Sequence, residues 1–88
     1  MPYVIIVYDV KNERVNKVHS FLKGYLYWVQ NSVFEGNITD ADLEALKTRL
    51  KEIIDEDADS IFIYSLATEK NLKKIVLGIE KKEVSLVL

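Results

Sequence analysis

The sequence predicts an α+β fold, a ferredoxin-like βαββαβ sandwich in which an antiparallel sheet carries two helices on one face. Three observations support this fold. Residues 3–8 form an unbroken apolar run, which is typical of a buried central strand. Two segments with helical apolar spacing follow, at about residues 13–23 and 39–55. Extended segments lie between and after them, so strands and helices alternate in the order of this fold.

Length and composition limit the function classes. Eighty-eight residues can enclose one core, so we expect a single domain over residues 1–88. The chain has no cysteine, which excludes disulfides and thiolate metal sites, and its one histidine, His19, has no neighbours typical of a catalytic set. No apolar run approaches the roughly 20 residues of a membrane span, and the N-terminus lacks a signal-peptide pattern. We expect a cytoplasmic protein without membrane contact.

The first strand ends in a carboxylate. Tyr3 to Tyr8 are apolar on both alternating faces, and Asp9 follows them directly at a turn. An acidic side chain at the end of a buried strand is costly unless it has a partner. The candidate partners are a metal ion, a hydrogen-bond donor, and the backbone amides at the start of the next helix.

The first helix is predicted from about Glu13 to Lys23, because apolar residues recur there at spacings of three and four. Gly24 is its natural C-terminal stop. Residues 25–34 are rich in aromatic and β-branched side chains, with a polar Gln30-Asn31-Ser32 stretch inside them. This pattern favours two short strands joined by a tight turn.

The second helix begins at Thr39, whose hydroxyl can accept a hydrogen bond from an early backbone amide, and it should end near Asp55. Residues 59–66 form the next extended block. Two further apolar stretches, at residues 75–79 and 84–88, predict an extra C-terminal strand appendix over residues 75–88.

Two helices cover only one face of the sheet, yet the first strand is apolar on both. A second copy of the chain is the most economical cover, so we expect a homodimer with the appendix of residues 75–88 at its interface. If Asp9 lies near the two-fold axis, its symmetry mate comes close. Two carboxylates would then form an oxygen site suited to Mg²⁺ or Mn²⁺.

Charge is segregated along the chain. The net charge is -2, but residues 40–59 carry eight acidic and three basic side chains, so the rest of the chain has an excess of three positive charges. Such runs are typical of solvated faces. If the chain binds nucleic acid, the contacts should use the basic C-terminal part and not the acidic second helix. The lysines of that part are Lys70, Lys73, Lys74, Lys81 and Lys82.

Several motifs together resemble a known family. They are Tyr8-Asp9-Val10, Asn16-Lys17-Val18 on the first helix, and Val29-Gln30 followed by Ser32-Val33-Phe34-Glu35-Gly36. At this separation they resemble the small CRISPR-associated protein of the spacer-acquisition machinery. The resemblance implies a ferredoxin-like symmetric dimer with a metal-binding aspartate pair at its axis. It also implies metal-dependent cleavage of single-stranded RNA or double-stranded DNA, and a bridging role with the CRISPR integrase.

The same resemblance implies roles for individual residues. Asp9 matches the catalytic, metal-binding aspartate, and Ser32 and Phe34 match residues near the active-site cleft that would contact nucleic acid. Lys17 falls where the family often has a basic residue on the first helix, and Arg14 is an approximate match to another. Both would contact phosphates.

Trp28 departs from the family pattern. It stands two residues before Gln30, where many members carry arginine. The departure removes a positive charge that could bind a phosphate or stabilise a transition state.

Three functions follow as hypotheses. The first is a dimeric CRISPR adaptation protein that bridges DNA with the integrase and uses the Asp9 pair as a metal-dependent endonuclease. The second is a purely structural nucleic-acid-bridging scaffold, for which the lysine-rich C-terminal part would matter and Asp9 would not. The third is a toxin-like endoribonuclease of a related ferredoxin-like family.

Overall fold

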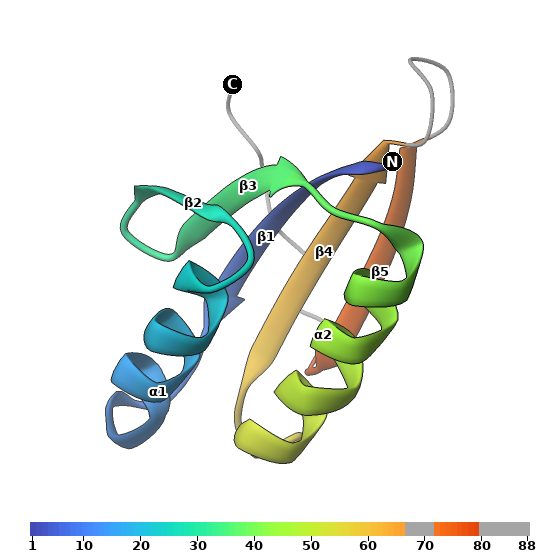
Figure 1. The fold of residues 1–88 in the computed structure, drawn as a ribbon. Coiled ribbons are helices and arrows are strands. Elements are labelled where there is room, and N and C mark those ends of the chain that lie inside the picture. The colour runs from blue at the N-terminus through green and yellow to red at the C-terminus, as the bar shows by residue number, and fades with distance from the viewer. Residues whose placement is uncertain (67–71, 80–88) are drawn as a thin grey trace.

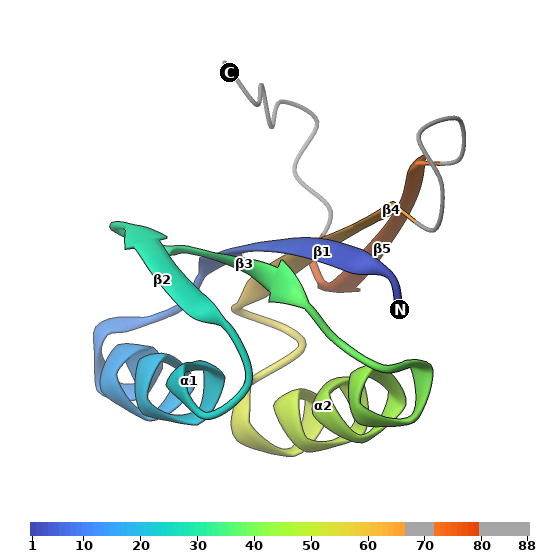
Figure 2. The ribbon, with the colours of Figure 1, turned by 45° about the horizontal axis from the view of Figure 1, so that its top comes forward.

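The computed structural model describes residues 1–66 and 72–79 of the chain (Figure 1). The elements run in the order β1 (Tyr3–Asp9), α1 (Asn12–Lys23), β2 (Tyr27–Gln30), β3 (Val33–Asn37), α2 (Asp40–Ile53), β4 (Ser60–Leu66) and β5 (Leu72–Gly78). The strands form one antiparallel sheet in the order β2-β3-β1-β4-β5. Both helices lie on one face of it (Figure 2). This arrangement confirms the predicted ferredoxin-like sandwich with an extra strand.

The helices lie close to where the apolar spacing placed them. α1 begins one residue before the predicted start, and Gly24 caps its C-terminus with a φ of -73°, so the helix ends without a left-handed residue. α2 begins directly after Thr39, whose Oγ1 accepts a hydrogen bond from the Asp42 amide at 3.1 Å. The predicted N-cap is confirmed.

The predicted strand pair is also present. β2 and β3 are joined at Asn31 and Ser32, and Asn31 has a positive φ of 42°, which asparagine tolerates better than most residues. The last described strand, β5, begins three residues before the predicted stretch at 75–79. The predicted strand at 84–88 lies outside the described residues.

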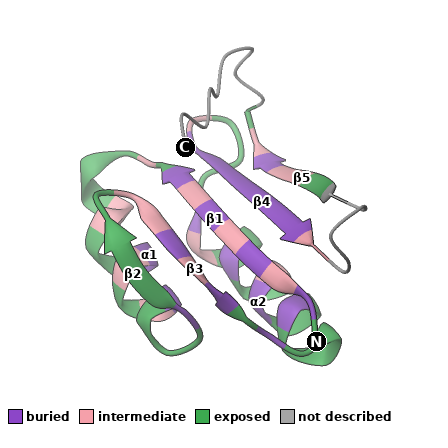
Figure 3. Ribbon diagram, turned by 90° about the horizontal axis from the view of Figure 1, so that it is seen from above, coloured by how far each residue is buried: buried purple, intermediate pink, exposed green. Residues whose placement is uncertain are grey.

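The core fills the space between the sheet and the helices. Val4, Ile6 and Tyr8 of β1 are buried on that side, and they alternate with the half-buried Tyr3, Ile5 and Val7 on the other. Figure 3 shows this alternation along β1 and shows β2 exposed along its length. Apolar residues on α1 and α2 complete the core: Val18, Leu22, Leu43, Leu46 and Leu50. Burying each leucine contributes roughly 1.5–3 kcal/mol.

None of the helices in the described part of the chain is both long enough and apolar enough to cross a membrane.

Candidate active site at the end of the central strand

Asp9 is the last residue of β1, the central strand, and its side chain is exposed. Its register partner is Ser60 at the start of β4. Because side chains alternate along a strand, Asp9 shares a face with Val7 and Ile5. That face is the one away from the helices, so Asp9 stands at the rim of a largely apolar sheet surface, on which Val7 and Ile5 are half-buried and their β4 partners Phe62 and Tyr64 are buried.

The β2–β3 turn brings Ser32 to the same end of the sheet. The Tyr8 amide donates a hydrogen bond to the Ser32 carbonyl oxygen at 3.0 Å, which ties the turn to the residue before Asp9. Ser32 is half-buried. Two of the residues that the resemblance singled out, Asp9 at the end of β1 and Ser32 in the β2–β3 turn, therefore lie at the same end of the sheet.

A second carboxylate at this end, Asp59, is fully buried. It precedes β4, and its two oxygens accept hydrogen bonds from the Lys11 amide at 2.9 Å and the Asp55 amide at 3.0 Å. The Arg14 guanidinium donates to both oxygens, through Nε at 2.5 Å and Nη2 at 3.1 Å. The guanidinium, helped by the two amides, lowers the pKa of Asp59 to about 2, against the opposing effect of burial.

The two basic residues expected on the first helix have different surroundings. The side chain of Arg14 is about 20% exposed and forms an ion pair with Asp59, which raises the pKa of Arg14. Lys17, one turn further along α1, is exposed. Lys17 is thus presented to solvent, whereas a phosphate contact by Arg14 would have to share its guanidinium with Asp59.

Phe34 lies in the core and has no exposed surface. Its ring packs against His19 at a centroid distance of 5.1 Å and against Tyr8 at 6.2 Å. The expectation that Phe34 contacts nucleic acid gains no support from this position, because an enclosed ring cannot reach a ligand. The residue instead holds β3 against α1.

Trp28 and His19 extend this aromatic cluster to the surface. The indole Nε1 donates to the Asn31 carbonyl at 2.9 Å, and the Trp28 ring meets the His19 ring edge-on with 5.3 Å between centroids. His19 Nδ1 lies 3.3 Å from the Tyr8 hydroxyl. His19 is therefore a packed helix residue, and Trp28 remains 55% exposed.

The described residues of one chain contain no ready-made cluster of metal ligands. Among residues 1–66 and 72–79, no three histidine, aspartate or glutamate side chains are grouped closely enough to hold one. Asp9 offers one exposed carboxylate, whereas Asp59 is buried and taken up by four hydrogen bonds. The donor chemistry fits a hard cation such as Mg²⁺ if a second carboxylate approaches Asp9 from outside.

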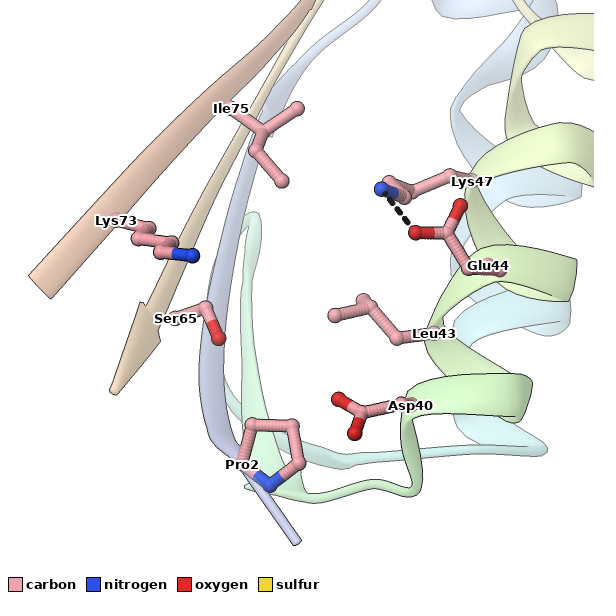
Figure 4. A pocket seen from close by; sticks show the side chains of 8 residues that line it. All are labelled: Pro2, Asp40, Leu43, Glu44, Lys47, Ser65, Lys73 and Ile75. Carbon is pink, nitrogen blue, oxygen red and sulfur yellow. Dashed lines mark hydrogen bonds and ion pairs between the residues drawn. The ribbon is translucent and has the colours of Figure 1, made fainter. Parts of the chain in front are cut away.

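A cavity of about 280 Å³ lies between α2 and the outer strands (Figure 4). Pro2, Ser65 and Lys73 line it, so it opens at the start of β1, away from Asp9. One of its two lysines is paired with its glutamate, since Lys47 Nζ lies 2.8 Å from Glu44 Oε1. The cavity is separate from the Asp9 site.

A comparison with protein families identifies the family of this chain. The family model described as "CRISPR associated protein Cas2" matches residues 1–75, which include Asp9, Ser32 and Asp59. The chain belongs to the Cas2 family.

Curated relatives cover nearly the whole chain. A protein named CRISPR-associated endoribonuclease Cas2 3 from Thermodesulfovibrio yellowstonii is 54% identical over 82 residues, 93% of each chain. A Cas2 protein from Methanothermobacter thermautotrophicus, also named an endoribonuclease, is 48% identical over 98% of this chain and 94% of its own.

Solved Cas2 structures share the fold. A structure titled "Crystal structure of cas2" has a TM-score of 0.73 and 48% identity, and covers 99% of this chain and 98% of its own. Streptococcus pyogenes Cas2 has a TM-score of 0.68 and 39% identity, and covers 77% and 88%.

Proposed function

We propose that this Cas2 protein acts as a symmetric dimer that cleaves phosphodiester bonds of nucleic acid during CRISPR adaptation, with the Asp9 carboxylates of the two copies forming a shared metal site. The observation that carries the proposal is the position of Asp9. It is exposed at the end of the central strand, on the sheet face away from the helices. A second sheet packed on that face would bring a second Asp9 toward the first.

The composition of the sheet face away from the helices supports a second copy as its partner. Val7 of β1 has Val33 of β3 and Phe62 of β4 as its register partners, and directly opposite residues in antiparallel pairs share a face. Ile5 and Tyr3 continue the surface along β1. A two-fold interface needs the same surface on both copies, and an apolar surface suits its core.

Asp9, Lys17 and Ser32 would have different roles in the reaction. The Asp9 pair would hold Mg²⁺ or Mn²⁺, which supplies positive charge to stabilise the charge that develops at phosphorus. Lys17 is exposed and would bind a neighbouring phosphate. Ser32, tied to the Tyr8 amide through its carbonyl, would place its hydroxyl at the edge of the substrate path. The names of the curated relatives favour RNA as the substrate.

Cleavage of labelled single-stranded RNA and duplex DNA tests the proposal, with Mg²⁺, with Mn²⁺ and with chelator. We expect cleavage by the wild type only when a metal is present, and its loss in Asp9→Asn by 100-fold or more. Asp42→Asn is the matched control, because it makes the same change on the exposed surface of α2. Cleavage that persists in Asp9→Asn or in chelator would contradict the proposal.

A second candidate is a scaffold that bridges DNA for the CRISPR integrase without cleaving it. The observation in its favour is Trp28, which stands where the resemblance implies an arginine. Its indole contacts Asn31 and His19, so this position supplies no positive charge for catalysis. Lys73 and Lys74, exposed on β5, would then contact DNA. Integration by the integrase with Asp9→Asn, together with no cleavage by the wild type, would favour the scaffold.

A further inference from the structure

We propose that Asp59 is a positioning residue for the Asp9 site: its buried carboxylate fixes the short link between β1 and α1, and so fixes where the Asp9 side chain lies. The inference rests on the proposed function, because it takes Asp9 to be a metal ligand. It assigns Asp59 no contact with substrate or metal.

The first step is the geometry of the link. Only Val10 and Lys11 separate Asp9 from α1. Asp59 Oδ1 accepts the Lys11 amide at 2.9 Å, two residues beyond Asp9. Before the link, Asp9 pairs in register with Ser60, the residue after Asp59. The β4 strand therefore holds Asp9 from the strand side and, through Asp59, from the helix side.

The second step is the rigidity of Asp59 itself. Its carboxylate also accepts from Asp55 in the turn after α2 and from both Nε and Nη2 of Arg14 on α1. A buried carboxylate of this kind has little freedom, because moving it would remove hydrogen bonds from a charged group that water cannot reach. One side chain thus joins α1, the α2–β4 turn and the start of β4.

The third step is the main chain on the other side. The Asp59 carbonyl accepts the Ile79 amide at 2.9 Å, and the Ser60 hydroxyl donates to the Ile79 carbonyl at 2.5 Å. The end of β5 thereby clamps Asp59 from the edge of the sheet. A displacement of the Asp59 main chain would have to break these hydrogen bonds, so the base from which the carboxylate reaches Lys11 is held in place.

This geometry gives Arg14 a role different from a phosphate contact. The Arg14 guanidinium donates to both Asp59 oxygens, so it would act on the site through Asp59. Lysine could not form this bidentate contact. The two roles are separable in solution. Loss of a phosphate contact weakens nucleic-acid binding and reduces its salt dependence, whereas loss of a positioning contact leaves both unchanged.

The experiment uses the full chain with Asp59→Asn, Arg14→Gln and Arg14→Lys, compared with Lys17→Gln. Arg49→Gln is the matched control for Arg14, because it removes an arginine ion pair with Glu52 on the exposed side of α2. Four quantities are measured: the Mn²⁺ dissociation constant, kcat and KM for labelled RNA, the salt slope of RNA binding, and hydrogen exchange at the Lys11 amide. Urea unfolding establishes that each variant is folded under the assay conditions.

We expect Asp59→Asn and both Arg14 variants to weaken Mn²⁺ binding by about 10-fold or more, as changes around metal ligands commonly do. Their kcat should fall by 10-fold to 100-fold with KM and salt slope unchanged, because a misplaced ligand costs rate. Hydrogen exchange at the Lys11 amide should be faster in these variants than in the wild type. Lys17→Gln should instead raise KM and reduce the salt slope, and Arg49→Gln should match the wild type.

An unchanged Mn²⁺ dissociation constant and kcat in folded Asp59→Asn would overturn the inference. A reduced salt slope in Arg14→Gln, with unchanged Lys11 exchange, would also overturn it and return Arg14 to the phosphate. If Asp59→Asn does not fold, the result for Arg14→Gln tests the inference instead. That variant keeps the hydrogen bonds from the Lys11 and Asp55 amides to the Asp59 carboxylate. If Asp9→Asn binds Mn²⁺ like the wild type while Lys11 exchange responds to Asp59, the proposed function has failed and not the positioning.

Discussion

Gly78 lies so close to the main chain of Asp59 that a β-carbon at position 78 would come within 2.0 Å of the Asp59 carbonyl oxygen. Its φ of +88° is also in the left-handed region, which residues with a side chain rarely adopt. The end of β5 can therefore reach Asp59 only because residue 78 is glycine.

We expect Gly78→Ala to lower the free energy of unfolding by about 3 kcal/mol, from the strained φ and the displaced backbone together. Gly24→Ala is the control. Its φ of -73° suits alanine, and a β-carbon there would lie 3.4 Å from its nearest neighbour, so it should stabilise by about 0.5 kcal/mol. Urea unfolding measures both. Equal stability of the two variants would contradict the close approach of β5 to Asp59.

The second prediction concerns acid stability. Asp59 has a pKa of about 2 in the fold against 3.8 as its ordinary value, so the unfolded chain binds its proton more readily. Its contribution is complete above about pH 5 and is lost as the pH falls toward 2. We expect the free energy of unfolding to fall more steeply over this range in the wild type than in Asp59→Asn. Parallel pH profiles would show that Asp59 is not the responsible carboxylate.

The third prediction concerns Trp28, which stands where the resemblance implies an arginine. Trp28→Arg should raise metal-dependent cleavage by about 10-fold to 100-fold if a positive charge beside the substrate is what the chain lacks. It should also cost about 1 kcal/mol of stability, because the hydrogen bond to Asn31 and the contact with His19 are lost. Trp28→Phe separates the two effects, since it loses the hydrogen bond without gaining charge. Unchanged cleavage in Trp28→Arg would refute the electrostatic explanation.

The fourth prediction concerns the sheet face away from the helices. Sedimentation at micromolar concentration should give about twice the chain mass of 10.2 kDa. Ile5→Glu should give the monomer mass, because a carboxylate in the apolar interface would be buried without a partner. Thr48→Glu, on the exposed side of α2, should leave the mass unchanged. A wild type that sediments as a monomer would remove both the interface and the shared Asp9 site.

Most of the fold could be predicted because its signals are local. The apolar run before Asp9, the helical spacing after it and the Thr39 cap each depend on neighbouring residues, and all three are found where expected. The conformation at Gly24 differed from a left-handed stop because the chain continues directly into the turn that leads to β2, with Tyr25 and Leu26 amides bonded back to Leu22.

The surroundings of Asp9 could be predicted only in part. The motif that contains Ser32 was enough to expect it near Asp9. The burial of Phe34 could not be predicted from the sequence of its strand, because it depends on packing against His19 of α1. Asp59 was one of many acids between residues 40 and 59, and its partner Arg14 is distant in sequence. The one local signal was its place directly before an apolar strand, where a charge needs a partner, as at Asp9.

The order of the strands also affects when the site can form during synthesis. β1 is made first, yet it lies between β3 and β4, so one of its neighbours is made only after α2. Pairing distant segments is slow compared with forming local ones, and a ribosome adds about 5–20 residues per second. The nascent chain therefore carries Asp9 through the synthesis of α1, β2, β3 and α2 before Ser60 and Asp59 exist to hold it. The strand end becomes a defined site only once β4 has been made and has paired with β1.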